Sequence, residues 1–295
     1  MIDEDYWNQK ACFQGYVSQL WPILRTFGGS KSLDWYTKTK KYSTVSDFQE
    51  ISGCLRSLKL TGDLIEFDSR PCLHSCSLEE LILNCCDFCV NVPQKYVPIF
   101  PHLKRLEIRA LDDRTPLEGL AFGGELRTLH LFTRTDLSTV RSIWKVARRN
   151  PHLSAIHLHN LDTEFFAYEL LRLASICSLR KLELIWLSWD GDDDDLATAQ
   201  ENDVVSQVQD LMVQITFHAP PQPFFSKILS TTFSSLRRFH LYVTRLKESR
   251  WKNKSSEPVL LILSLLENFE LKCGRLEYLE KPDFVLSTGN SLREV

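Results

Sequence analysis

Five cysteines lie close together in the first third of the chain, where their type and spacing suggest metal ligands. They are Cys72, Cys76, Cys85, Cys86 and Cys89. One pair with three intervening residues and one pair with two superficially resemble a four-thiolate zinc site. Between the pairs, however, the pattern of residues 78–83 predicts a strand, and cysteine is itself a common small buried residue. The favoured interpretation is structural thiols, and a Cys/His metal-binding protein is the alternative.

Histidine is the second residue type whose placement suggests chemistry. Of the eight histidines in the chain, His130 and His157 are expected on adjacent strands, about 4.8 Å apart, with His159 on the same face. Imidazoles can bind a transition metal, but no cysteine or carboxylate clearly completes a set of ligands. Because an unperturbed histidine titrates near pH ~6.5, a pH-sensitive binding surface is the simpler interpretation.

Two charged segments are interpreted as solvated surface. Residues 190–195 carry carboxylates at close spacing, but they lack the order of an EF-hand loop, so an acidic loop is expected there. Basic residues recur between Arg141 and Arg149 without the interleaved aromatic residues of nucleic-acid surfaces. They are expected on the exposed face of a helix.

The sequence contains none of the motifs of common catalytic sites. It has no Gly-x-Ser-x-Gly motif, no phosphate-binding loop, no dinucleotide glycine pattern and no His-Glu-x-x-His. We therefore expect a protein that is not an enzyme, with no cofactor, no bound metal and no small-molecule substrate.

Composition argues against two further classes of partner. The formal net charge of -3 at pH 7 gives no overall attraction to nucleic acid or to an acidic membrane. No apolar run approaches the ~18 residues of a membrane-spanning helix. The acidic N-terminus lacks the features of a secretory signal, and nine cysteines then fit free thiols in a reducing compartment. A cytoplasmic or nuclear location is expected.

A short phrase that recurs through most of the chain must position these residues. Its pattern is apolar-x-x-apolar-x-apolar, the clearest copy spans residues 78–83, and copies follow one another at intervals of 23 to 33 residues. The copies begin at Leu55, Leu78, Leu103, Leu126, Leu153, Leu179, Met212, Leu236, Leu266 and, incompletely, Leu292. Such a period is typical of a solenoid, in which each repeat buries an apolar face against its neighbours.

Each copy is expected to form a strand with its apolar residues inward and the residues between them outward. Neighbouring copies then pair as a parallel sheet, which requires crossover connections that are often helical. The predicted crossover helices are residues 138–149, 163–175, 203–210, 224–230 and 259–265.

Residues 1–53 do not carry the phrase and are expected to form an N-terminal helical cap or linker, because a terminal repeat would otherwise expose its apolar edge. Residues 13–24 have apolar side chains at helical spacing, and residues 43–51 are expected to form a second short helix. Residues 54–295 then form one domain of about ten irregular repeats. The last is incomplete, which suggests that the protein continues beyond Val295.

The outward residues of the phrase form the face on which a partner is expected to bind. Two rows, one between the last two apolar positions and one just after them, are rich in histidine, aromatic and charged residues, as protein-binding surfaces tend to be. The predicted partner-binding residues are Arg105, Glu107, Arg109, His130, Phe132, His157, His159, Lys181, Glu183, His218, Arg238, His240 and Tyr242. Alternatively, these positions are polar only because water contacts them.

The phrase and its period resemble the leucine-rich repeat family across residues 54–295. Family members usually place Asn or Cys three residues after the phrase, and here only Cys86 matches, so the resemblance is to a degenerate member. It implies an α/β fold: a right-handed solenoid, or horseshoe, with a parallel concave β-sheet and a helical or irregular convex side. It also implies a protein partner on the concave face.

Irregular repeats with helical crossovers resemble more specifically those of divergent fungal F-box/leucine-rich-repeat proteins. In that family an F-box docks a Skp-type adaptor, and the repeats hold a ubiquitination target. The resemblance implies the target-recognition part of a ubiquitin ligase subunit, although residues 1–50 contain no clear F-box opening. The alternative is a free-standing repeat scaffold or inhibitor with no link to ubiquitin.

Overall fold

The fold is given by a computed structural model of the chain, which divides into two compact units. The structure describes residues 32–36, 43–44, 55–68, 77–91, 99–110, 117, 121–133, 137–159, 161, 167–189, 205–217, 229, 232–246, 259–262, 265–273, 284–288 and 291–294. One unit comprises Met1–Thr133 with Lys145–Leu153, and the other comprises Arg134–Trp144 with Ser154–Val295. Within the described residues, no helix is both long enough and apolar enough to span a membrane.

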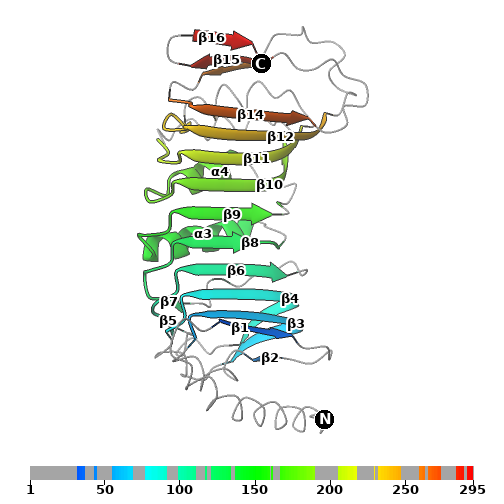
Figure 1. The fold of residues 1–295 in the computed structure, drawn as a ribbon, viewed down its shortest axis with the longest axis vertical. Helices are drawn as coiled ribbons and strands as arrows, with labels where there is room; N and C mark the ends of the chain where they lie inside the picture. Colours follow the sequence, from blue (N-terminus) through cyan, green and yellow to red (C-terminus); the bar gives the residue numbers. More distant parts are fainter. Residues whose placement is uncertain are drawn as a thin grey trace. The chain divides into compact units, whose positions relative to one another are not determined.

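The first unit is built on a parallel sheet with strand order β1-β3-β4-β6-β8, in which β2 also pairs with β3 (Figure 1). Its strands are β1 (Ser32–Tyr36), β2 (Ser43–Thr44), β3 (Ser57–Asp68), β4 (Glu80–Asn91), β6 (Arg105–Ala110) and β8 (Thr128–Leu131). In the connections, β5 (Ile99–Phe100) and β7 (Ala121–Phe122) form a second parallel pair.

The second unit contains a parallel sheet with strand order β9-β10-β11-β12-β14. Its strands are β9 (Ala155–His159), β10 (Lys181–Trp189), β11 (Asp210–Phe217), β12 (Arg238–Leu246) and β14 (Asn268–Cys273). The helix α4 (Ala167–Ala174) lies in the connection from β9 to β10. A separate small sheet consists of β13 (Val259–Ile262), β15 (Phe284–Thr288) and β16 (Ser291–Glu294).

The leucines of the phrase form the core of each unit. Leu81 of β4 pairs with Leu106 of β6 in the first unit, and both are fully buried. Leu182 of β10 pairs with Ile156 of β9 in the second unit and is buried in the same way. Because strand side chains alternate between faces, the residues between the leucines lie on the opposite face, called here the outward face. The predicted solenoid is confirmed within each unit.

Two of the predicted crossover helices are found. Residues 138–149 form α3 (Leu137–Arg149), and part of residues 163–175 forms α4. The buried positions of α3 recur at helical spacing and include Val140, Ile143 and Ala147. The basic residues of its other side, from Arg141 to Arg149, are exposed as predicted. A connection can therefore be recognised as helical where its apolar residues keep a helical period.

Two other predicted helices are wrong. Residues 205–209 are not helical and β11 begins at Asp210, because Ser206 and Val208 are buried while their neighbours are exposed, which is the period of a strand. Residues 259–262 form β13, because a short apolar run fits a buried strand as well as a helix. The helix predicted over residues 224–230 lies largely outside the described residues.

The copy of the phrase predicted to begin at Met212 is wrong by four residues. The register of β10 and β11 pairs Leu182 with Leu211 and Leu184 with Val213. Leu211 and Val213 are fully buried, as is Val208, whereas Met212 is half-buried on the outward face. The phrase therefore begins at Val208. It was misplaced because β11 continues with apolar residues that imitate a second copy.

The parallel sheet begins before the first predicted copy and does not include the last one. In β1, Leu33 pairs with Leu58 and Trp35 pairs with Leu60, so a strand lies inside the segment predicted to be helical. The helix predicted over residues 43–51 is wrong at its start, which is β2; the rest of it and residues 13–24 lie outside the described residues. Leu292 belongs to β16, which pairs antiparallel with β15.

Candidate functional site

The register of the strands aligns the predicted partner-binding residues in rows across the outward face. In the first unit, one row contains Lys59, Ile82, Glu107 and His130, and Arg109 lies beside Asn84 in the next row. In the second unit, the corresponding row contains His157, Glu183, Met212, His240 and Glu270. In its next row, His159 lies beside Ile185, and Tyr242 lies between Gln214 and Lys272. Each unit thus presents a regular array of side chains of mixed charge.

One predicted site residue does not have the position that the sequence suggested. The four-residue correction in β11 places Gln214, and not His218, next to Tyr242. His218 itself lies outside the described residues. His130 and His157 were predicted to lie on adjacent strands. They form no site within either unit, because His130 belongs to the first unit and His157 to the second.

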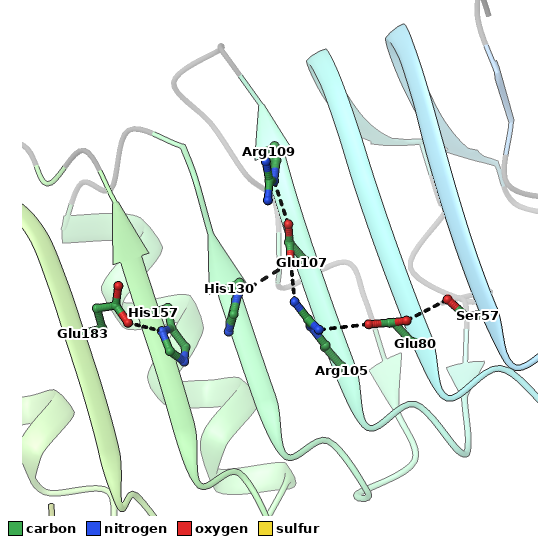
Figure 2. Close-up of polar contacts among 8 residues, drawn as sticks. All are labelled: Ser57, Glu80, Arg105, Glu107, Arg109, His130, His157 and Glu183. Carbon is green, nitrogen blue, oxygen red and sulfur yellow. Dashed lines mark hydrogen bonds and ion pairs between the residues drawn. The ribbon is translucent and has the colours of Figure 1, made fainter. Parts of the chain in front are cut away.

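Glu107 is the centre of the polar contacts on the first unit (Figure 2). Its side chain is only 3% exposed, yet it lies on the outward face, covered by the longer side chains around it. Its Oε1 accepts a hydrogen bond of 2.6 Å from Nε of Arg109, and its Oε2 accepts one of 2.8 Å from Nη2 of Arg105. The Nδ1 atom of His130 lies 3.6 Å from the same Oε2.

Burial and charge act in opposite directions on Glu107. Burial is the largest single influence on the pKa of this carboxyl and raises it, because it disfavours the charged form. The hydrogen bonds and charges of Arg109 and Arg105 together outweigh burial, so the pKa of Glu107 lies below its ordinary value. The carboxylate is therefore ionised at neutral pH and holds two guanidinium groups in fixed positions.

The contacts of Arg105 extend this arrangement across two more strands. Its Nη1 lies 3.1 Å from Oε1 of Glu80 on β4, and Oγ of Ser57 on β3 donates a 2.7 Å hydrogen bond to Oε2 of Glu80 (Figure 2). Ser57 and Glu80 were not among the predicted site residues. The signal that would have identified them is the register itself, which places both in the same row as Arg105.

Arg109 and Phe132 form the exposed edge of this cluster. The guanidinium carbon of Arg109 lies 4.5 Å from the centre of the Phe132 ring, within the range of a cation–π interaction. The ring of His130 lies 6.2 Å from that of Phe132 in an edge-to-face arrangement. The side chain of Arg109 is 52% exposed. A cation fixed on one side by a buried carboxylate and on another by an aromatic ring is thus presented to solvent.

In the second unit, His157 and Glu183 form a largely buried pair on β9 and β10 (Figure 2). The Nδ1 atom of His157 donates a 2.6 Å hydrogen bond to Oε2 of Glu183, and their side chains are 11% and 17% exposed. This hydrogen bond is the main cause that holds the pKa of Glu183 below its ordinary value, against the raising effect of burial. The charges of Lys181 and His159 lower the pKa further.

A similar pair lies at the other end of the same row. The Nδ1 atom of His240 donates a 2.8 Å hydrogen bond to Oε2 of Glu270, whose Oε1 lies 2.7 Å from Nζ of Lys272. The contact with Lys272, followed by that with His240, lowers the pKa of Glu270. Conversely, Glu270 and then Tyr242 raise the pKa of Lys272, whose Nζ lies 5.1 Å from the centre of the Tyr242 ring.

The remaining predicted residues complete the face of the second unit. Arg238 is exposed, and its Nη2 lies 2.9 Å from Oδ2 of Asp210, its register neighbour on β11. Lys181 and His159 are half-buried on their strands. Glutamates and histidines therefore recur as neighbours at one position of the phrase, at Glu107 and His130, at His157 and Glu183, and at His240 and Glu270.

The other residues singled out in the sequence form no site in the described part of the chain. There, no group of three or more His, Cys, Asp or Glu side chains is placed to hold a metal ion. Cys85 is a buried free thiol, and Cys86 and Cys89 lie on β4. Cys72, Cys76 and the acidic run at residues 190–195 lie outside the described residues.

Comparisons with protein-family models, with curated proteins and with solved structures give no match to this chain. A function must therefore be inferred from the geometry and chemistry of the outward face.

Proposed function

We propose that this chain is a protein-interaction module of the leucine-rich repeat type, with no enzymatic activity, and that it holds a protein partner on the outward face. In this proposal the outward face is the concave side of a right-handed horseshoe, and its convex side is helical or irregular. The observation that supports it best is the ordered array of charged and aromatic side chains, fixed by contacts between neighbouring strands.

The chemistry of the array favours a protein partner. Arginine, tyrosine and other aromatic residues contribute most of the binding energy in many protein interfaces, and Arg109, Arg238 and Tyr242 are of these types. Their contacts within the face, such as that of Arg238 with Asp210, restrict the side chains before a partner arrives. Binding then loses less side-chain entropy than it would on a surface of free rotamers.

The more specific form of the proposal is target recognition in an F-box-like ubiquitin ligase subunit of the cytoplasm or nucleus. It is supported by the resemblance of the repeats to those of fungal F-box/leucine-rich-repeat proteins, and it adds a Skp-type adaptor as a second partner. A free-standing scaffold or inhibitor is the competing form, since the outward face needs no adaptor to bind a protein.

Affinity capture tests the proposed binding face. The protein encoded by the complete natural gene, tagged and expressed in its own cells, is compared with a triple variant, Arg238→Gln, Tyr242→Ala and Lys272→Gln. All three residues lie on the outward face of β12 and β14, and removing them should abolish capture of the partner identified by mass spectrometry. The matched control replaces Arg141, Arg148 and Arg149 of α3 by Gln. These residues are also exposed, and their loss should leave capture unchanged.

The two forms of the proposal differ in what is captured. Recovery of a Skp-type adaptor with both triple variants, and of a target with the control alone, supports the ligase subunit. Capture of a single protein without an adaptor supports the scaffold or inhibitor. If the outward-face variant retains every partner of the wild type, the proposed binding face is wrong.

A further inference from the structure

One apolar residue interrupts the polar row on the outward face of the second unit. The row contains, in strand order, His157, Glu183, Met212, His240 and Glu270. Met212 lies on β11, the middle strand of that sheet (Figure 1). Its chain neighbours Leu211 and Val213 are fully buried, whereas Met212 is half-buried and reaches the surface. The centre of this face is therefore apolar.

Two larger side chains lie diagonally beside Met212 on the neighbouring strands. Met212 pairs with Glu183 on β10 and with His240 on β12. Two residues further along those strands are Ile185 and Tyr242, which are both half-buried. Diagonal neighbours on one face of a sheet are within reach of long and aromatic side chains. Ile185, Met212 and Tyr242 therefore form an apolar area, called here the Met212 patch.

The two histidine–glutamate pairs on either side of this patch bond away from it. Glu183 bonds His157 at 2.6 Å, on the side of β10 that is opposite to β11. His240 bonds Glu270 at 2.8 Å, on the side of β12 that is opposite to β11. Each charged or titratable neighbour in the row thus has its bond on the far side, and the apolar centre stays open between them.

The charges nearest the patch are balanced. In the row of Met212 and the row on either side of it, the cations are Lys181, Arg238 and Lys272, and the anions are Asp210, Glu183 and Glu270. Each of these anions contacts a basic side chain, at 2.6 to 2.9 Å. Where the strands begin, Arg237 contacts Glu267, and Arg180 bonds two backbone carbonyl oxygens. This face is therefore complementary to a partner surface that is itself uncharged at the point of contact.

We propose that the Met212 patch binds an apolar side chain of a protein partner, such as leucine, methionine or phenylalanine, presented by an uncharged segment. This anchor packs on Met212 between Ile185 and Tyr242, and the paired polar groups around it exclude water, as around the anchors of many protein interfaces. A charged side chain placed there would lose its hydration and find the nearby counter-charges already engaged. The inference rests on the proposed function and adds the chemistry of the partner.

The test selects binders from a phage-displayed library of random linear peptides on the purified protein. Fluorescence anisotropy then measures the binding of the enriched peptides, each labelled with fluorescein. These peptides should share an apolar residue flanked by uncharged residues. Their dissociation constants should change by less than about threefold between low and high salt, because salt screens interactions between charges.

Substitutions of Met212 test whether the peptides bind at the patch. Met212→Gln keeps the length and neutrality of the side chain but makes its end polar, and it should weaken binding about tenfold, as expected for the loss of an apolar contact. Met212→Leu keeps the apolar contact and should retain most of the binding.

Ile82→Ala is the matched control. Ile82 is the half-buried apolar residue at the same position of the phrase on β4 of the first unit, so its truncation should leave peptide binding unchanged. Circular dichroism and thermal unfolding show that each variant keeps the fold.

Four results would overturn the inference. They are no enrichment of any peptide, enrichment of charged peptides whose binding falls steeply with salt, equal binding by wild type and Met212→Gln, and self-association of the wild type that Met212→Gln abolishes. The last result would make a second copy of the chain the occupant. If one of these is found while the outward-face triple variant still abolishes capture, only the apolar-anchor inference is wrong. If the triple variant leaves capture intact, the proposed function itself is wrong.

Discussion

At the scale of single residues, the outward face is organised by its glutamates. Glu107, Glu183 and Glu270 occupy the same position of the phrase. Each contacts a histidine on a neighbouring strand, and the charge of at least one further basic group lowers its pKa. Cross-strand pairs of opposite charge stabilise a sheet by about 0.2–1 kcal/mol each on exposed surfaces. Where the carboxylate is buried, its removal costs more, because its partners lose a counter-charge that water does not replace.

Glu107→Gln should lower the free energy of unfolding by about 1–3 kcal/mol. The amide cannot accept charge-assisted hydrogen bonds from both arginines, and it leaves two cations close together. Because both guanidinium groups are about half exposed, water screens part of this loss, and the low end of the range is expected. Urea denaturation measures the change. Glu79→Gln, which removes a carboxylate of the same face whose side chain is 37% exposed, should have a clearly smaller effect.

Glu183 should give the second unit an acid-sensitive stability. Its folded pKa lies below its ordinary value, chiefly through the hydrogen bond from His157. The stabilisation is therefore fully present above the unfolded pKa of about 4.3 and is lost as the pH falls through the lower folded pKa. The stability difference between wild type and Glu183→Gln, measured by urea denaturation, should be largest near neutral pH and shrink below about pH 4.5.

A second substitution identifies the cause of this pH dependence. His157→Leu removes the donor, so the wild-type loss of stability in the acidic range should become shallower in this variant. An equally steep acidic loss in wild type and His157→Leu would show that the pair does not produce it.

The residues of the face could be predicted from sequence better than their contacts could. The phrase alone selects the outward positions, and it therefore predicts Arg105, Glu107 and His130 as residues of this face. Their burial was not predictable, because a glutamate on a solvent-facing row is normally exposed, and Glu107 is covered by long side chains around it, including Arg105 and Arg109 of its own strand. Rows follow from periodicity, whereas coverage depends on which long side chains meet across the register.

At the scale of elements, the phrase predicts strands well where only one alignment of its apolar positions fits the sequence. It fails at β11, where a longer apolar alternation allows two frames, and at β1, where only Leu33 and Trp35 fit the pattern. It also fails at β13, a run of four apolar residues with no polar alternation. At β11 and β13 the sequence lacks the contrast between apolar and polar positions that would distinguish one register or period from another. At β1 the alternation is present, but Ser30 occupies the first apolar position of the phrase.

The register of β11 can be tested by comparing two adjacent residues. Leu211→Ala should cost about 2–5 kcal/mol of unfolding free energy, because Leu211 is fully buried and pairs with Leu182. Met212→Ala should cost less than about 1 kcal/mol, because Met212 is half-buried on the outward face. The frame predicted from sequence requires the reverse order. Chemical denaturation of both variants therefore decides between the two registers.

The turn after β7 depends on a close approach of two backbone segments. A Cβ atom on Gly123 would lie 2.3 Å from the carbonyl oxygen of Pro101, beside the hydrogen bond from Gly123 N to Phe100 O. Backbone atoms cannot move aside as a flexible side chain would. Gly123→Ala should therefore lower the melting temperature and weaken the β5–β7 pair, with a cost of about 1–3 kcal/mol. Arg127→Ala, an exposed change a few residues later, should shift the melting temperature little.

At the scale of the whole molecule, each unit is a solenoid segment in which a strand contacts mainly its neighbours in the sheet. The stability of such an arrangement is approximately the sum of the intrinsic stability of each repeat and the stability of each interface between neighbouring repeats. Damage to one repeat therefore spreads only over a limited distance. The fully buried leucines of successive strands contribute to both the repeats and their interfaces. The two units therefore offer two independent tests of the same physical principle.

Leu182→Ala in β10 should loosen the second unit locally. The substitution should cost about 2–5 kcal/mol as a core truncation, and hydrogen exchange followed by mass spectrometry should show it strand by strand. Amides of β9, β10 and β11 should exchange faster, because β10 pairs with both neighbours, whereas those of β12 and β14 should keep more of their protection. Leu81→Ala should act in the same way on β3, β4 and β6 of the first unit. An outward-face variant such as Arg238→Gln serves as the control, and it should leave the exchange pattern of both units unchanged. A uniform loss of protection throughout a unit would instead mean that the unit unfolds as one cooperative block.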